Sequence, residues 1–135
     1  MSQENVVVFT RAVEAYNRRD IDAFLEAFDP DVEWRPLTQA MFGTEETVYR
    51  GHDGVRKFMR EVDEAFSEVQ IDRLETRDLG ERIVVIGHLR ARGKASSAET
   101  ESPIGWVVEF KDGRVTRMSD YLDPKAAFEA AGLRE

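Results

Sequence analysis

The fold of this chain follows from residues 104–122, which have the sequence IGWVVEFKDGRVTRMSDYL. Two runs rich in valine and aromatic residues flank Asp112-Gly113. That dipeptide readily takes the positive φ angles of a tight hairpin turn. The stretch is therefore predicted to be a β-hairpin with a two-residue turn.

A two-residue turn fixes which residues of the hairpin face each other. Counting outward gives these pairs: Phe110 with Val115, Val107 with Met118, and Gly105 with Asp120. On this count Asp120 shares a face with Val107 and Met118, and Trp106 points to the opposite face. Both faces carry apolar residues, so both are expected to be covered.

Helical segments precede the hairpin. Apolar residues recur at intervals of three and four within residues 6–16, 21–28 and 53–66, which predicts three helices with one buried face each. Asp29-Pro30 is expected to end the second helix. A short helix is also predicted at the C-terminal end, where Asp123 is the cap, Pro124 takes the first helical position and Gly132 follows the last.

Alternating apolar residues predict strands in three further places. Val32 and Trp34 form a short strand that ends at Pro36. A second strand follows Ser67, with Leu74 out of phase as a β-bulge would place it. Residues 82–92 form a third, with Val85 and Leu89 on one face and His88 and Arg90 on the other. The order of elements indicates an α+β fold.

The segment 37–50 has no clear periodicity but carries Met41, Phe42 and Tyr49. Long loops in compact domains are usually functional lids or mobile segments. Two interpretations stay open: the loop covers a pocket, or it packs against the body of the protein. A curved sheet around helices leaves a mouth, where we expect a pocket of roughly 300 Å³ or more.

Composition limits the functional classes. The 135 residues favour one domain spanning 1–135, and the absence of cysteine removes disulfides and thiolate sites. With 27 acidic and 19 basic residues the net charge is −8, which argues against nucleic acid and anionic membranes as partners. No apolar segment follows Met1, so a cytoplasmic location is expected. The two histidines, His52 and His88, lie far apart, and neither a metal site nor a cofactor is expected.

Four motifs carry a resemblance to a known family: YNRRDIDAFLEAFDPDVEWRP, YRGHDGVRKFM, VVEFKDGRVTRMSDYLDP and EAAGL. They resemble the SnoaL-like branch of the nuclear-transport-factor-2-like superfamily over nearly the whole chain. The resemblance implies a cone-shaped α+β barrel, in which a curved mixed or antiparallel sheet wraps around the N-terminal helices. Members commonly form dimers through the sheet. They include polyketide cyclases, ketosteroid isomerase, limonene epoxide hydrolase and scytalone dehydratase, and also proteins without known activity, so the fold alone assigns no chemistry.

Single residues at the matching positions distinguish between the enzyme types of the superfamily. The positions that resemble those of the base aspartate and the oxyanion-donating tyrosine of ketosteroid isomerase are Trp34 and Ala12. This chain therefore lacks both functional groups of the isomerase. Of the epoxide hydrolase residues only Asp120 is kept. SnoaL-type cyclases are thought to use a histidine and an aspartate on the last strand, and His88 and Asp120 resemble that pair.

The candidate catalytic residues are therefore Asp120 and His88, as general acid and base. The alternative is that Asp120 pairs with Arg90 and that His88 fills a polar gap. The candidate substrate-binding residues are Tyr16, Trp34, Phe42, Tyr49, Phe58, Arg90, Trp106 and Met118.

Two functional hypotheses follow. The first is an enzyme that moves a proton on a small apolar carbonyl compound, as a cyclase, isomerase or dehydratase. The second is a non-catalytic protein that binds a small apolar ligand in the same pocket. A carboxylate and an imidazole within hydrogen-bond reach in the cavity would favour the enzyme, and an apolar or collapsed cavity would favour the binder. A homodimer through the outer sheet face is expected, because the helices can cover only one face of the hairpin.

Overall fold

The structure is a computed structural model that describes residues 2–45 and 47–133. Its elements are α1 (Ser2–Asn17), α2 (Ile21–Leu25), β1 (Phe28–Arg35), α3 (Thr38–Phe42), β2 (Tyr49–Arg50), α4 (Gly51–Ala65), β3 (Phe66–Asp78), β4 (Arg82–Gly93), β5 (Glu99–Lys111), β6 (Arg114–Tyr121) and α5 (Pro124–Ala130). The predicted α+β class is confirmed. Within the described ranges, no helix is both long and apolar enough to cross a membrane.

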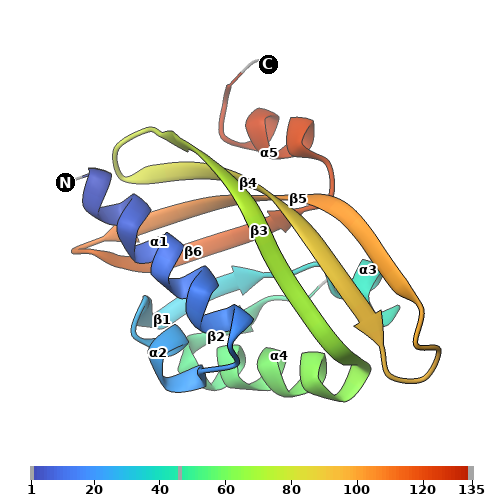
Figure 1. Ribbon diagram of the computed structural model, residues 1–135. Helices are drawn as coiled ribbons and strands as arrows, with labels where there is room; N and C mark the ends of the chain where they lie inside the picture. Colours follow the sequence, from blue (N-terminus) through green and yellow to red (C-terminus); the bar gives the residue numbers. More distant parts are fainter. Residues whose placement is uncertain (1, 46, 134–135) are drawn as a thin grey trace.

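The six strands form one mixed sheet in the order β2-β1-β6-β5-β4-β3. Strands β1 and β6 run parallel, and the other neighbouring pairs are antiparallel. The long strands curve, with α1 lying across one face of the sheet and α5 lying apart from the other helices (Figure 1). Side chains of α1, α2 and α4 form the main core with the concave face of this sheet. This is the cone-shaped arrangement that the resemblance implies.

The hairpin turn is as predicted, but the register changes beyond it. Asp112 and Gly113 both have positive φ, at 53° and 78°. Phe110 faces Val115, after which a β-bulge at Thr116 adds one residue to β6. The pairs beyond the bulge are Glu109 with Arg117, Val108 with Met118, Val107 with Ser119, Trp106 with Asp120, and Gly105 with Tyr121.

The predicted pairs of Val107 with Met118 and Gly105 with Asp120 are therefore wrong by one residue. A tight turn determines pairing only as far as the first bulge, because the extra residue moves every later side chain to the other face. The consequence is that Trp106, Met118 and Asp120 share the concave face. The bulge predicted near Leu74 is present, since the pairing of β3 with β4 shifts between Asp72 and Glu75.

The second predicted helix is shorter than expected. Helix α2 ends at Leu25, and Asp29-Pro30 lies inside β1 rather than after a helix. Strand β1 pairs with β6 at Phe28 and again only from Glu33 onward. Pro30 falls in this gap, where no backbone N–H is needed for the ladder. The strand can therefore begin before the proline.

Segment 37–50 contains the short helix α3 and the two-residue strand β2. Phe42 packs against Phe58 and Phe66, with ring centroids 5.8 and 6.4 Å apart. Both open interpretations thus describe part of the segment, because Phe42 packs on the body while the neighbouring Met41 lines a cavity.

Helix α5 covers the outer face of the sheet near the hairpin. Ala127 and Ala131 are buried there against Val84, together with Ile86, Val107 and Tyr121. The chain itself therefore covers the apolar outer residues that motivated the homodimer. The homodimer stays a prediction, and the molar mass in solution tests it.

Ala127 gives a direct test of how α5 docks. It is fully buried, and an ideal Cβ at Gly105 would lie only 3.0 Å from its side chain. Ala127→Arg should lower the free energy of unfolding by about 1–3 kcal/mol, the usual cost of overpacking. It should also increase binding of a hydrophobic dye, because the outer apolar face becomes exposed. Ala130→Arg, on the exposed side of the same helix, is the control, and equal effects of the two would contradict this docking.

Candidate functional site

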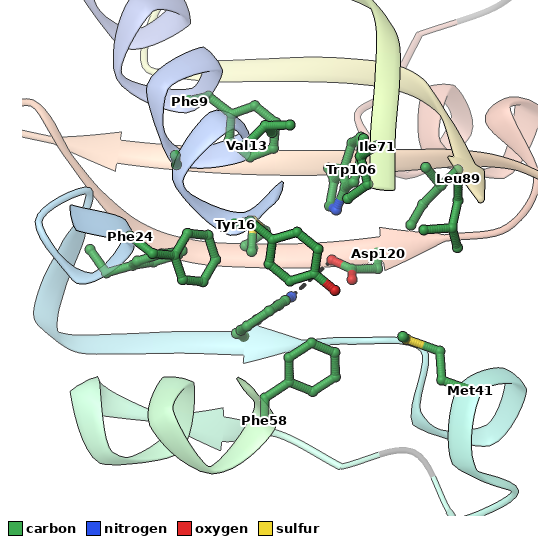
Figure 2. Close-up of a pocket in the computed structure, with 15 residues that line it drawn as sticks. Phe9, Val13, Tyr16, Phe24, Met41, Phe58, Ile71, Leu89, Trp106 and Asp120 are labelled. Carbon is green, nitrogen blue, oxygen red and sulfur yellow. Dashed lines mark hydrogen bonds between the residues drawn. The ribbon is translucent and has the colours of Figure 1, made fainter. Parts of the chain in front are cut away.

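A cavity lies between the helices and the concave face of the sheet (Figure 2). It is lined by Phe9, Ala12, Val13, Tyr16, Phe24, Phe28, Trp34, Met41, Phe58, Ile71, Leu89, Ile104, Trp106, Met118 and Asp120. Asp120 is the one side chain with a carboxyl group among these residues. The sequence therefore places a single carboxylate in an otherwise apolar space.

The cavity volume is about 40 Å³. This is far below the roughly 300 Å³ expected for a site that holds a small molecule, so that size prediction is wrong for this conformation. Aromatic rings fill the space: Trp34 and Phe58 have centroids 4.4 Å apart, and Phe24 and Phe28 are 4.8 Å apart. A ligand therefore needs some lining side chains to move.

The mouth of the cavity can be located from exposure. Met41, Leu89 and Asp120 are half-buried, whereas the other lining side chains are buried. These three residues come from α3, β4 and β6. The carboxylate thus lies at the opening, beside two flexible apolar side chains.

Asp120 is held by Trp34. The indole Nε1–H donates to Asp120 Oδ1 over 2.9 Å, as the dashed line in Figure 2 marks. The parallel pairing of β1 with β6 sets Trp34 opposite Met118, two residues before Asp120. A hydrogen bond to a charged acceptor is stronger than one between neutral groups. The carboxylate therefore has a fixed position despite its apolar surroundings.

Tyr16 is the second polar group of the site. It is buried on α1, and its hydroxyl points toward the Asp120 carboxylate (Figure 2). Burial raises the pKa of Tyr16 to about 12, the negative charges of Asp120 and Asp63 add to that rise, and Arg19 opposes it. The phenol is therefore protonated at neutral pH and can donate a hydrogen bond.

The structure brings six of the predicted site residues together around the cavity: Tyr16, Trp34, Phe58, Trp106, Met118 and Asp120. Four do not line it: Phe42, Tyr49, His88 and Arg90. Phe42 and Tyr49 pack against Phe58 from outside the cavity, and the Tyr49 hydroxyl donates to Glu61. They support the wall of the cavity rather than form it.

His88 is the main correction. Its ring lies on the outer face of the sheet, with Nδ1 3.3 Å from Asp72 and Nε2 3.0 Å from Glu101. Its neighbour Leu89 lines the cavity, and side chains alternate along a strand, so His88 and Arg90 both point away. The predicted acid–base pair of His88 with Asp120 is therefore wrong, as is the pairing of Asp120 with Arg90.

Sequence reasoning missed several lining residues, although the signals were present. Those missed as site residues are Phe9, Ala12, Val13, Phe24, Phe28, Ile71, Leu89 and Ile104. Phe9, Val13 and Tyr16 belong to one helical stripe, and Ile71 and Leu89 face each other across β3 and β4.

In the part of the chain that the structure describes, no group of three His, Asp or Glu side chains could hold a metal ion.

The Trp34 hydrogen bond can be tested by substitution. Trp34→Phe should lower the free energy of unfolding by about 1.5–3 kcal/mol more than Trp106→Phe, because a hydrogen bond to a charged group contributes about that much. Both changes shrink a buried indole in the same cavity, but only Trp34 donates to Asp120. Urea unfolding measures the difference. Equal losses would mean that the bond contributes little.

Comparisons with known proteins agree with this architecture. Residues 9–118 match the model of the SnoaL-like domain. A nuclear-transport-factor-2-like protein of unknown function from Burkholderia pseudomallei is 28% identical, with a TM-score of 0.80 over 93% of this chain and 95% of that one. The protein TerC, co-crystallised with polyporic acid, is 24% identical, with a TM-score of 0.79 over 93% and 96% of the two chains.

A candidate polyketide cyclase from Xanthomonas campestris is 18% identical, with a TM-score of 0.76 over 90% and 92% of the two chains. At these identities TerC and the cyclase candidate show a shared fold. No protein of curated function matches the chain. The match to the domain model covers most of the sequence and confirms the predicted family, and the chain therefore belongs to the SnoaL-like domain family.

Proposed function

We propose that the cavity binds a small, largely apolar carbonyl compound and that Asp120 transfers a proton on it. One observation carries the proposal: a single carboxylate lies at the mouth of an apolar cavity, held by Trp34 and faced by the Tyr16 hydroxyl. Carboxylates in such positions are suited to general acid and base catalysis. In this proposal Tyr16, rather than His88, is the polar partner of Asp120.

The proton transfer can be written with these two groups. Asp120 removes a proton from the carbon next to the carbonyl, and the electrons of that C–H bond form the enolate. The negative charge develops on the carbonyl oxygen, which accepts a hydrogen bond from Tyr16. Donors already in place for a developing charge lower the barrier. Return of the proton to a different carbon of the enolate gives the isomerised product. If the enolate carbon instead attacks a second carbonyl of the same ligand, a C–C bond forms and the proton goes to the new alkoxide, which gives a cyclised product. If a β-hydroxyl leaves, its C–O bond breaks and the proton goes to the departing oxygen to give water.

Ligand entry requires the mouth to open. The closed cavity of about 40 Å³ cannot hold a ring, and Met41 and Leu89 are the half-buried apolar side chains at its edge. Methionine has an unbranched side chain that adapts easily to a partner. Met41 is therefore the side chain whose displacement admits the ligand.

The comparisons support a small organic ligand. The chain belongs to the SnoaL-like family, one structural neighbour is a candidate polyketide cyclase, and TerC was crystallised with polyporic acid. The second candidate function is a non-catalytic binder with the same cavity. The small closed volume and the position of His88 outside the cavity favour it.

The Asp120→Asn variant separates the two functions. In D₂O, wild-type protein should exchange the α-protons of apolar ketones, as followed by proton NMR. Asp120→Asn should reduce that exchange by about 100-fold or more, the usual contribution of an acid–base group. Ligand binding should survive, because the shape of the side chain is kept.

Asp112→Asn is the matched control, since it makes the same change at an exposed turn residue. Unchanged exchange in Asp120→Asn would refute the catalytic role and leave the binder. Unfolding of Asp120→Asn would instead identify the carboxylate as a structural partner of Trp34.

Binding itself can be measured with polyporic acid as the probe. Trp34 and Trp106 both line the cavity, so a bound ligand should quench their fluorescence. Met41→Ala should tighten binding by roughly a few-fold, because the closed state no longer has to be opened at that side chain. Thr44→Ala, at an exposed position after α3, should leave the affinity unchanged. Equal affinity of Met41→Ala and wild type would place the entrance elsewhere.

A further inference from the structure

Arg19, between α1 and α2, carries one unfavourable feature. Its φ of 61° is the left-handed angle of a Schellman motif that ends α1, with Asp20 N–H donating to Ala15 O and Arg19 N–H to Tyr16 O. Its Nη1 atom, however, is buried and has no hydrogen-bond partner among residues 2–45 and 47–133. Native proteins rarely leave a buried polar atom unpaired. This nitrogen therefore calls for a functional explanation.

The contacts of Arg19 direct its charge to Tyr16. Its Nε lies 3.2 Å from Asp63 Oδ1 on α4, and its guanidinium carbon lies 5.1 Å from the centroid of the Tyr16 ring. Tyr16 in turn lines the cavity, with its hydroxyl toward Asp120. The guanidinium is therefore clamped between an acidic helix residue and the donor of the proposed site.

Stability alone does not account for this placement. The Asp63 side chain is 53% exposed, and ion pairs with such exposed partners contribute little. The preceding Arg18 shows the ordinary alternative, since its side chain is 59% exposed and lies 3.6 Å from Asp20. Arg19 is instead only 28% exposed. The chain thus holds a half-buried positive charge beside Tyr16.

We infer that Arg19 is a positioning residue that holds Tyr16 and makes the cavity selective for ligands whose oxygen at Tyr16 is, or becomes, negatively charged, namely enolates and phenolates. The inference rests on the proposed function for the place of the ligand. Charges interact more strongly in the interior than in water. When Asp120 takes up a proton, the ligand oxygen gains the negative charge, and Arg19 then compensates it through the Tyr16 hydroxyl.

The first test uses 4-nitrophenol, whose visible absorption reports its ionisation. Bound to wild-type protein it should be the phenolate, with an ionisation constant about 10-fold or more above that of the free phenol, as expected for a nearby opposite charge. Arg19→Met should remove most of this increase, and Arg19→Lys should restore much of it. Arg18→Met, the exposed neighbour, should behave as wild type.

The second test needs no ligand. Protein labelled with 3-fluorotyrosine allows the ionisation of Tyr16 to be followed by fluorine NMR, and Tyr16→Phe identifies the resonance. The charged groups that act on Tyr16 are Arg19, Asp63 and Asp120. Because the positive charge of Arg19 favours the tyrosinate, Arg19→Met should raise the pKa of Tyr16 by the equivalent of about 10-fold in its ionisation constant. Arg18→Met should not.

The outcomes separate this inference from the proposed function. If Asp120→Asn leaves the α-proton exchange unchanged, only the proposed catalytic role fails. The ionisation of bound 4-nitrophenol is measured without turnover and tests the role of Arg19 separately. If wild type binds 4-nitrophenol as the neutral phenol or not at all, the charge selectivity is refuted. If Arg19→Met leaves both ionisation constants unchanged, Arg19 is structural. Glycine adopts the left-handed φ of residue 19 without cost, so Arg19→Gly removes the side chain alone. Unfolding of both Arg19→Met and Arg19→Gly would also identify a structural role for Arg19.

Discussion

The hydrogen bond between the Trp34 indole and the Asp120 carboxylate joins β1 and β6, the two neighbouring parallel strands of the sheet, on its concave face. An unpaired carboxylate among aromatic rings would be costly to desolvate. The bond exists because β1 and β6 run parallel and because the bulge at Thr116 turns Asp120 inward. Without that extra residue, Trp106 and Asp120 would lie on opposite faces, and the cavity would have no carboxyl group.

Around this bond the charges alternate from the cavity to the surface. Asp120 is followed by the Tyr16 hydroxyl, then by the Arg19 guanidinium, and finally by Asp63 on α4. Each charge thus has a neighbour of the opposite sign or a donor close by, which is how partly buried charges are kept in proteins. Although the chain as a whole is acidic, with a net charge of −8, a half-buried positive group lies beside Tyr16 at this place.

The sequence predicted the α+β class because helix and strand periodicities were strong in α1, α4 and β4, and it predicted the family through the resemblance of four motifs. It also predicted Tyr16, Trp34, Phe58 and Asp120 as site residues, since one face of each element is clearly apolar. It could not locate the bulge at Thr116, because both faces of the hairpin carry apolar residues and either register buries some of them. The pairing of His88 with Asp120 came from the resemblance to SnoaL-type cyclases, and the bulge places Asp120 on the concave face while His88 lies on the outer face. The outer face looked available for a partner because the docking of α5 is a tertiary contact that no periodicity reveals.

On the proposed function, selectivity in this cavity comes from its polar groups rather than from its shape. A closed volume of about 40 Å³ is not a template for any ring system, and aromatic walls accept many apolar molecules at similar cost. A hydroxyl, a carboxylate and a half-buried guanidinium, in contrast, discriminate strongly, because a ligand that leaves them unmatched loses their hydrogen bonds and charge compensation. On the proposed function, the apolar lining supplies affinity, and the Asp120, Tyr16 and Arg19 groups decide which oxygen-bearing ligand is accepted.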